Sequence, residues 1–431
     1  MKVIFDGHIH SKYARATSKD MDLKNLEKYA RIKGVSLLGT GDFTHPEWIK
    51  EIKAELKEDG SGILRSYSGF PFLLQTEISL AYTHGGKGRR IHHIIMAPNL
   101  ETVGQITEFL LTKGRVDYDG RPIFGMSSIE LVERLQGISQ DIEVIPAHAW
   151  TPWFGILGSE SGFDSLKECF GDKVSLIHSI ETGMSSNPAM NWRIPSLDNI
   201  TLTSNSDCHS FWPWRIGREA NVLEMKELSY KNVLAAIRER KGFSETIEVD
   251  PGYGKYHFDG HRLCGVVMSP QESAEHKNIC PKCGKKMTIG VLNRVEQLAD
   301  PERPEGFTKK DAIPFKSLIP LSEIIAELNG FPIASRKTWQ VYNALIERFG
   351  NEFNILLEAA EDELKKVVDD KLAAAILKNR EGKIQVKPGY DGEYGKPILD
   401  SRRSNDKKSA AAADTTTAPT KRKQKGLNDF F

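Results

Sequence analysis

Four histidines and three carboxylates recur close to the ends of predicted strands in the first 210 residues. Two pairs of alternate residues flank this stretch, His8-x-His10 and Asp207-x-His209. Because alternate side chains of an extended segment point to the same side, each pair offers two donor groups to one place. The remaining members of the pattern are Asp42, Glu77, which closes a predicted strand, and His148.

A single histidine or acidic residue at a strand end is more often a cap or turn residue than a ligand. Seven of them in one domain favour a metal centre. Imidazole and carboxylate groups without a thiolate suit divalent ions such as zinc or manganese. The carboxyl ends of parallel strands in a barrel meet on one face, so we expect these side chains to gather there.

A second metal-binding pattern lies further along the chain. His261 and Cys264 are followed by Cys280-Pro-Lys-Cys283-Gly284. Two thiolates two residues apart can bind one ion, and a tetrahedral zinc site needs four ligands. His261 is the expected fourth ligand, with His257 and His276 as alternatives. We predict a closed, structural zinc site, and the odd number of five cysteines also favours metal binding over disulfides.

Aromatic and polar residues follow several of the candidate ligands. Two aromatic clusters come after His148 and His209, and either could pack in the core or wall a pocket for an unstacked base. A polar segment between them starts at Glu181 and could contact substrate or form a helix-capping turn. Two arginines near the second cluster, Arg215 and Arg218, could bind phosphate or be surface charges. The candidates for substrate contact are Trp150, Trp153, Glu181, Ser185, Trp212, Trp214 and Arg215.

Strands alternating with helices must position these residues. Helical spacing from Leu23 to Ile32, with Gly34 as a stop, is typical of an amphipathic helix. Such alternation predicts an α/β fold with a parallel sheet, open or closed into a barrel. The seven predicted strands are Lys2–Phe5, Val35–Gly39, Phe72–Ile78, Ile91–Ala97, Ile142–Pro146, Val174–Ile180 and Ile200–Thr203.

Changes in composition divide the chain into five parts. A turn-rich junction follows Val249, helical periodicity begins near Pro314, and Ser, Ala, Thr and Lys dominate after Ser401. The expected units are a metal-dependent nuclease domain (1–248), a zinc-binding module (249–305), a helical DNA-binding region (306–395), a disordered linker (396–423) and a terminal box (424–431).

The terminal box matches the motif that binds a sliding clamp (PCNA). Gln424 is followed by Leu427 and then by Phe430 and Phe431. A short helical turn would bring the three apolar side chains together as a plug for an apolar pocket. We therefore expect a ring clamp as a partner.

Composition limits the remaining possibilities. The chain has 431 residues, a net charge of +1 and 27% charged residues, which excludes a wholly disordered protein. Residues 401–431 carry eight Lys and Arg against three Asp, so the first 400 residues are slightly acidic. A globally basic nucleic-acid binder is therefore not expected. We also expect no membrane span and no signal peptide.

The ligand pattern resembles the PHP (polymerase and histidinol phosphatase) superfamily. This resemblance implies a distorted seven-stranded α/β barrel with up to three metal ions and phosphoesterase activity. It assigns His8, His10, Glu77 and Asp207 to a first metal. Glu77 would be shared with a second metal, together with His148 and either His92 or His93, of which His92 is slightly favoured.

The third position departs from the PHP pattern. The family has an Asp followed directly by His, whereas Asp42 and His45 are three residues apart here. Either residue could fill the role beside His209. The resemblance implies two-metal hydrolysis with Glu77, Asp207 and His148 as catalytic residues, and zinc, magnesium or manganese as the ion.

The combination of all parts resembles the endonuclease Q family of archaeal DNA repair enzymes. That resemblance implies cleavage 5′ to uracil, hypoxanthine, xanthine or an abasic site in damaged DNA. It also implies a monomer in the cytoplasm, associated with the nucleoid. Two alternatives stay open: a small-molecule phosphatase like histidinol phosphatase, and a non-catalytic adaptor that binds zinc and the clamp.

Overall fold

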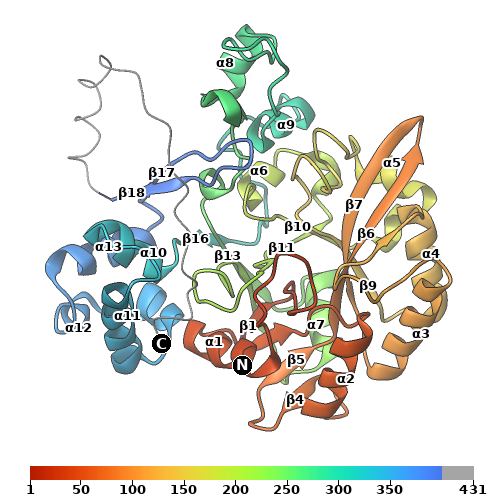
Figure 1. Ribbon diagram of the computed structural model, residues 1–431, viewed down its shortest axis with the longest axis horizontal. Coiled ribbons are helices and arrows are strands. Elements are labelled where there is room, and N and C mark those ends of the chain that lie inside the picture. Colours follow the sequence, from red (N-terminus) through yellow and green to blue (C-terminus); the bar gives the residue numbers. More distant parts are fainter. Residues whose placement is uncertain (400–431) are drawn as a thin grey trace, which may run out of the picture.

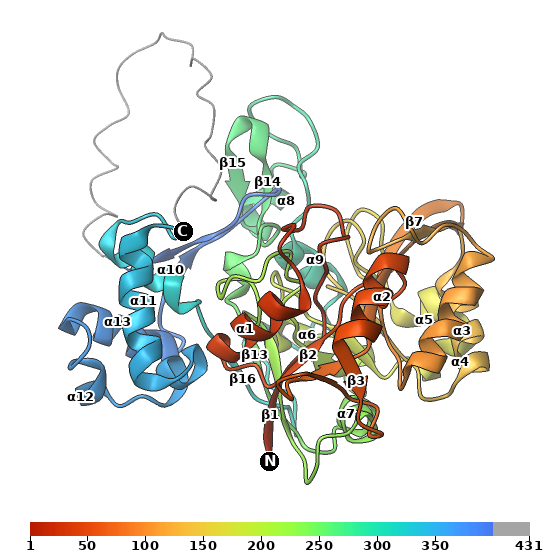
Figure 2. The ribbon, with the colours of Figure 1, turned by 60° about the horizontal axis from the view of Figure 1, so that its bottom comes forward.

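The computed structural model describes residues 1–399. A large α/β body carries a small projecting module, labelled by α8 in Figure 1, and a helical unit labelled by α10 to α13 (Figures 1 and 2). The clamp-binding box and nearly all of the predicted linker lie outside the described residues.

The largest sheet has eight strands and spans both the N-terminal and the central part of the chain. Only β1, β2 and β5 run parallel in its middle, whereas β12 pairs antiparallel with β1 and with β13. In spatial order the strands are β16 (Phe315–Ser317), β13 (Phe243–Glu248), β12 (Ala220–Glu224), β1 (Lys2–Asp6), β2 (Leu37–Gly39), β5 (Pro71–Leu73), β4 (Leu64–Ser66) and β3 (Leu56–Glu58).

A four-stranded sheet contains the longest hairpin of the described chain. Its order is β8 (Ile123–Phe124), β6 (Gln75–His84), β7 (Lys87–Met96) and β9 (Glu143–Pro146). Gly85 and Gly86 turn the hairpin with φ of 57° and 74°, a left-handed conformation that glycine adopts without steric cost. The pairs β6/β7 and β7/β9 are antiparallel, so the predicted parallel sheet is wrong here.

Two predicted strands have different bounds in the structure. Phe72–Ile78 is divided between β5 and β6, so Glu77 lies near the start of a long strand and does not close one. In Val174–Ile180 the first residues belong to a 3₁₀ helix, η1 (Gly171–Leu176), and the strand is β10 (Ser179–Glu181). β10 pairs in parallel with β11 (Thr201–Thr203) in a separate sheet. The fold is therefore mixed α/β, and its strands are divided among several hydrogen-bonded sheets.

Helices cover the outside of these sheets. α1 begins after Asp22, whose side chain accepts from Asn25 N, and ends at Gly34 with φ 99°, as predicted. Buried aliphatic and aromatic side chains, such as Ile9, Trp48 and Phe72, fill the space between helices and sheets. The helices of the body are α1 (Leu23–Lys33), α2 (Pro46–Glu55), α3 (Leu100–Leu111), α4 (Ser128–Ile138), α5 (Leu166–Phe170), α6 (Pro188–Asn191), η2 (Pro195–Leu197) and α7 (Tyr230–Glu239).

The C-terminal third forms the projecting module and the helical unit. The module and its base contain η3 (Pro251–Tyr253), β14 (Asp259–His261), η4 (Arg262–Cys264), β15 (Val266–Met268), α8 (Pro270–Glu275) and α9 (Val291–Leu298). The helical unit contains α10 (Leu321–Asn329), α11 (Arg336–Phe349), a π-helix η5 (Asn354–Glu358), α12 (Glu361–Leu364) and α13 (Asp370–Arg380).

A hairpin of β17 (Gln385–Lys387) and β18 (Lys396–Ile398) follows the helical unit. It runs back towards the projecting module, and Tyr390 in its loop forms a bridge with Phe258. The predicted linker was expected to begin at residue 396, but β18 is an ordered strand. A strand of three residues such as β18 is too short to show a hydrophobic periodicity, so the sequence pattern did not predict it.

Candidate metal centre and nucleic-acid site

Two groups of metal-donor side chains meet at Glu77. The first contains His8, His10, Glu77 and Asp207, and the second contains Glu77, His92 and His148. Within each group the donor atoms lie within 4.8 Å of one another. These groups are the ones that the family resemblance assigned to the first and second metals.

The two carboxylate oxygens of Glu77 face different groups. Oε1 lies 2.8 Å from His92 Nδ1 and 3.2 Å from His148 Nε2. Oε2 lies 3.2 Å from His10 Nε2 and 3.6 Å from His8 Nε2. This arrangement would allow one carboxylate to bridge two divalent ions.

His8 supplies an independent test of whether a metal fits. Its Nε2 atom is buried and has no hydrogen-bond partner among residues 1–399. It faces carboxylate oxygens of Glu77 and Asp207, each 3.6 Å away. A buried imidazole nitrogen without a partner is costly, whereas a metal ligand needs that lone pair. The donor set therefore fits a divalent cation.

Two further carboxylates hold the imidazole rings of the first group. Glu181 lies 3.1 Å from His8 Nδ1, and Asp42 lies 3.0 Å from His10 Nδ1. A hydrogen bond from Nδ1–H fixes the tautomer and turns Nε2 towards the metal. Asp42 therefore supports His10 and does not complete a third donor group. Glu181, expected to touch substrate, contacts a ligand instead, although it also lines the pocket.

Burial and neighbouring charges shift the pKa values of this cluster in opposite directions. Burial alone would raise the pKa of Glu77, but His92, Arg121 and His8 hold it well below its usual range. Burial lowers the pKa of His92 to about 4, despite Glu77. His92 is therefore neutral near pH 7, the form in which an imidazole binds a metal.

Three site residues have left-handed backbone conformations. The φ angles are 42° for Asp42, 31° for His148 and 45° for Asp207. Each residue follows a strand, so the sharp turn redirects its side chain after the extended segment. Backbone strain of this kind costs about 1–3 kcal/mol per residue and is concentrated at functional sites.

The structure does not assemble a third donor group from His45 and His209 within residues 1–399. His45 caps α2, accepting from Glu47 N at 3.3 Å, and its ring stacks on Tyr13. The ring of His209 lies 4.7 Å from that of His10, and its Nδ1 is 3.7 Å from Asp207 Oδ1. His209 lines the pocket beside the metal groups.

His92 and His93 point to opposite faces of β7, as neighbouring strand residues do. His93 Nε2 lies 2.9 Å from Ser128 Oγ under α4, away from the metal groups. We expect His92→Gln to weaken binding of the second metal at least tenfold, because one nitrogen ligand is lost. His93→Gln should leave metal affinity unchanged and lower thermal stability. Calorimetric titration with Mn²⁺ checks this, and equal losses in both variants would contradict it.

A pocket of about 670 Å³ opens beside the metal groups. Metal ligands form part of its floor, and Trp153, 36% exposed, forms part of its wall. Trp153 meets Tyr256 edge to face at 5.9 Å. Of the predicted substrate-contact residues, the pocket is lined by Trp153, Glu181, Ser185 and Arg215.

The other three predicted tryptophans pack elsewhere. Trp150 is 1% exposed and donates its Nε1–H to Asn191 Oδ1 at 2.8 Å, so it belongs to the core. Trp212 and Trp214 stack on each other. Their ring centroids lie 5.4 and 5.5 Å from that of Trp339 in α11. These two residues join the α/β body to the helical unit and do not line the pocket.

Several pocket residues were not predicted from the sequence. Arg121 Nη1 donates to Glu77 Oε2 at 3.1 Å. Lys255 and Tyr394 reach the pocket from two other parts of the chain, whereas Arg218, which the sequence had suggested together with Arg215 as a phosphate contact, also lines it. None of them belongs to a motif, and only the tertiary fold brings them to the metal groups.

Two crystal structures resemble nearly the whole chain. The lesion-specific endonuclease PfuEndoQ from Pyrococcus furiosus is 31% identical, with 94% of this chain and 98% of that chain covered and a TM-score of 0.82. Endonuclease Q bound to a 27-mer duplex with an abasic lesion at the active site is 32% identical, with 96% and 100% covered and a TM-score of 0.83. The chain belongs to the endonuclease Q family.

The chain is therefore an enzyme, a metal-dependent endonuclease that acts on DNA. YqxK of Bacillus subtilis is 29% identical over 92% of this chain and 99% of its own length. MJ0043 of Methanocaldococcus jannaschii is 35% identical over 58% of this chain, and the match spans only 31% of the MJ0043 sequence. Residues 320–383 match the family described as the MJ0043 C-terminal domain, which coincides with the helical unit.

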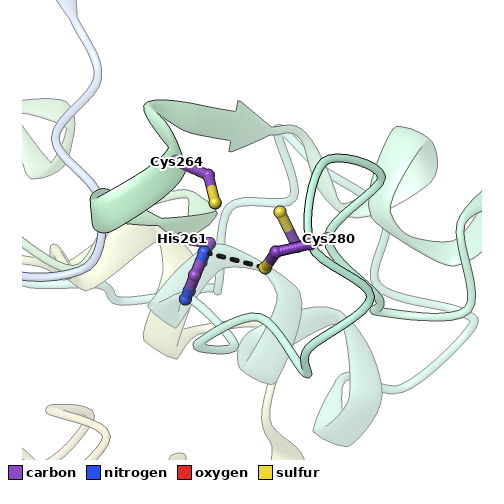
Figure 3. A group of neighbouring side chains, drawn as sticks. His261, Cys264 and Cys280 are labelled. Atoms are coloured by element: carbon purple, nitrogen blue, oxygen red, sulfur yellow. Dashed lines mark hydrogen bonds between the residues drawn. The ribbon is translucent and has the colours of Figure 1, made fainter.

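The projecting module holds a separate group of metal-donor side chains. His261, Cys264, Cys280 and Cys283 lie within 4.8 Å of one another. In Figure 3, His261, Cys264 and Cys280 are turned towards a common centre. His261 Nδ1 lies 3.5 Å from Cys283 Sγ.

The local charge at this group suits a metal thiolate. Burial would raise the pKa of Cys280, but the backbone N–H groups of Lys282 and Cys283 bring it to about 7. The alternative ligands His257 and His276 lie outside the group. Cys169 and Cys208 are buried in the body, as predicted.

Among the described helices, none combines the length and apolar character needed to cross a bilayer.

Proposed function

We propose that this protein is a DNA repair enzyme that cleaves the phosphodiester 5′ to uracil, hypoxanthine, xanthine or an abasic site. The observation that carries the proposal is the placement of Glu77 between two donor groups, of which His92, His148 and Asp207 line a large pocket. The 5′ position and the range of bases follow from the family resemblance.

The proposed mechanism uses the chain's own residues to hold and orient the reacting groups. Divalent ions (zinc, magnesium or manganese) at the two groups would supply hydroxide near neutral pH and neutralise charge on the phosphoryl oxygens. Asp207, 30% exposed at its side chain, faces the pocket and can accept a proton from the attacking water. Arg121 lines the same pocket and can donate to a phosphoryl oxygen.

Orientation of His148 depends on its second nitrogen. Nδ1 lies 3.0 Å from Thr151 Oγ1, while Nε2 faces Glu77 at 3.2 Å. The backbone N–H of His148 donates to Glu181 Oε2 at 2.7 Å. Glu181 thus contacts residues of both groups and keeps their relative positions.

The pocket is large enough for an extruded nucleotide. Trp153 and Tyr256 offer aromatic surface on which a base could stack. Extruding a mispaired or damaged base costs less than extruding a paired one. This difference in cost favours lesions over normal DNA.

End-labelled duplexes that carry one uracil, inosine or abasic site test the proposal. We expect one metal-dependent nick immediately 5′ to each lesion and none in the unmodified duplex. Turnover of phosphomonoesters without any nick would instead identify a phosphatase like histidinol phosphatase. Absence of both activities, with no metal in the body, would identify an adaptor.

The four donors of the projecting module are proposed to bind structural zinc. A module this small lacks a full apolar core, so metal binding supplies folding free energy. Replacing Cys280 and Cys283 with Ser should remove one equivalent of zinc, unfold the module and weaken DNA binding. Zinc content by plasma emission and proteolysis of residues 250–300 measure this. Unchanged zinc content would contradict it.

The clamp contact proposed for Gln424, Leu427, Phe430 and Phe431 concerns residues outside the described part. Burial of three apolar side chains would contribute roughly 5–8 kcal/mol before ordering costs. We therefore expect micromolar affinity for a ring clamp such as PCNA. Phe430→Ala with Phe431→Ala should abolish clamp binding and stimulation while cleavage of short duplexes continues. Full binding by the double variant would contradict the proposal.

We further propose that the enzyme acts as a monomer in the cytoplasm, at the nucleoid where its DNA substrate lies.

A further inference from the structure

Three cationic side chains from two segments meet at one side of the pocket. Arg215 and Arg218 lie between β11 and β12, and Lys255 follows η3. Tyr394, in the loop of the β17–β18 hairpin, stands between them. Its ring centroid is 5.4 Å from Arg215 Cζ and 5.6 Å from Lys255 Nζ. We call these four residues the cationic subsite.

Arg218 has an unused donor in this subsite. The residue is 7% exposed, and its Nε and Nη2 donate to Ser206 O at 3.1 and 2.9 Å. Its buried Nη1 has no hydrogen-bond partner in the described part of the chain. A buried guanidinium nitrogen without an acceptor costs free energy. Nε and Nη2 hold the guanidinium group in place, and Nη1 is left without an acceptor. This arrangement therefore indicates that an anionic ligand binds at Nη1.

The cations of the subsite also repel one another. Burial and the neighbouring Arg218 lower the pKa of Arg215. Burial raises the pKa of Tyr394, but Arg218, Lys255 and Arg215 together bring it below its usual value. Asp207 faces the subsite from the metal groups, and Glu323 faces Arg215 from α10. Burial raises the pKa of Glu323 to about 7, so it is an incomplete counter-charge.

We propose that the cationic subsite binds one non-scissile phosphate of the DNA strand, next to the phosphate that is cleaved. This inference rests on the proposed function. Arg218 Nη1 would donate to a phosphate oxygen, while Arg215 and Lys255 supply positive charge. Arginine and lysine at a buried, donor-rich position are suited to phosphate.

Position distinguishes this phosphate from the scissile one. Arg121 contacts Glu77, the residue shared by both metal groups. The side chains of the cationic subsite make no hydrogen bond or ion pair to a metal ligand in the described structure. They line the pocket beside the metal groups, so a strand whose scissile phosphate is at the metals would place a neighbouring phosphate here. The contact would fix the register of cleavage relative to the lesion.

Neutral backbone substitutions test the proposal directly. Lesion duplexes would carry a single methylphosphonate at the phosphate on either side of the scissile one. For the wild-type enzyme, we expect one of these two positions to weaken binding at least tenfold. In Arg215→Gln with Lys255→Gln, the same methylphosphonate should cost less than half as much as in the wild type, because the charges of Arg215 and Lys255 are already missing and only Arg218 still faces the phosphate. Arg134→Gln, an exposed arginine outside the pocket, is the control and should behave as wild type.

Salt dependence gives a second measurement that does not require cleavage. The slope of log K against log salt should fall by about 1 when one phosphate contact is lost. Arg218→Lys keeps the charge without the fork, and it should lower affinity with a smaller change in slope. The proposal is overturned if the double variant keeps the full methylphosphonate penalty, or if neither flanking position matters to the wild type. Failure of the wild type to nick the unmodified lesion duplex would instead contradict the proposed function.

Discussion

Glu77→Gln is expected to abolish DNA cleavage, with a loss of at least about 10³-fold in single-turnover rate. An amide removes the negative charge and leaves a single oxygen for two donor groups that Glu77 now faces with both of its oxygens. A loss of 10³-fold corresponds to about 4 kcal/mol of transition-state stabilisation. Single-turnover nicking of a uracil duplex measures the effect.

Metal content separates loss of chemistry from loss of fold. Glu77 is buried, and Arg121 and four histidines lie against it, so Glu77→Gln also leaves these groups with one negative charge fewer. Circular dichroism should show a folded protein. Metal analysis by plasma emission should show fewer bound ions. Glu108→Gln, at an exposed position of α3, should retain wild-type rate and metal content. Full activity of Glu77→Gln would exclude shared coordination by this residue.

Spacing suggested the paired donors His8 and His10 because it depends on local geometry, whereas His92 was suggested only by the family resemblance. His8-x-His10 extends a strand, and alternation alone places both imidazoles on one side. The ends of α1 were predictable for a similar reason, since Gly34 stops a periodic segment. Burial and the turns around Asp207 were not visible in this way, because a left-handed residue other than glycine leaves no mark in composition.

The supporting residues depend on contacts between distant segments. Glu181 lies 173 residues from His8, and its role follows only from the 3.1 Å contact. Asp42 follows a strand, as the predicted ligands do, yet its carboxylate lies against Nδ1 of His10, the ring nitrogen that does not face Glu77. Likewise the antiparallel pairing of β6 and β7 was not apparent from the sequence, because a short apolar run does not fix the direction of the strand that pairs with it. Sequence patterns therefore identify candidate donor residues, but they do not distinguish the residues that face a metal from those that support a ligand.

A buried ion pair joins the α/β body to the helical unit. Lys33 Nζ, at the end of α1, lies 2.7 Å from Glu352 Oε1, and the side chains are 2% and 0% exposed. Glu352 also accepts from Leu321 N at 3.0 Å and from Tyr342 OH at 2.8 Å. Lys33 donates further to Pro213 O at 2.9 Å. All polar atoms of the pair are thus matched across the two units.

Glu352→Ala is expected to destabilise the protein by about 3–5 kcal/mol, because it leaves the Lys33 ammonium buried without a counter-charge. Lys33→Met in the same chain should recover much of this loss, since an apolar pair needs no compensation. Urea unfolding of the two single variants and the double variant measures the coupling. Glu361→Ala, which removes an exposed partner of Lys365 in the helical unit, should change stability little. A Glu352→Ala variant as stable as wild type, or a double variant no more stable than Glu352→Ala, would show that this pair does not hold the helical unit against the body.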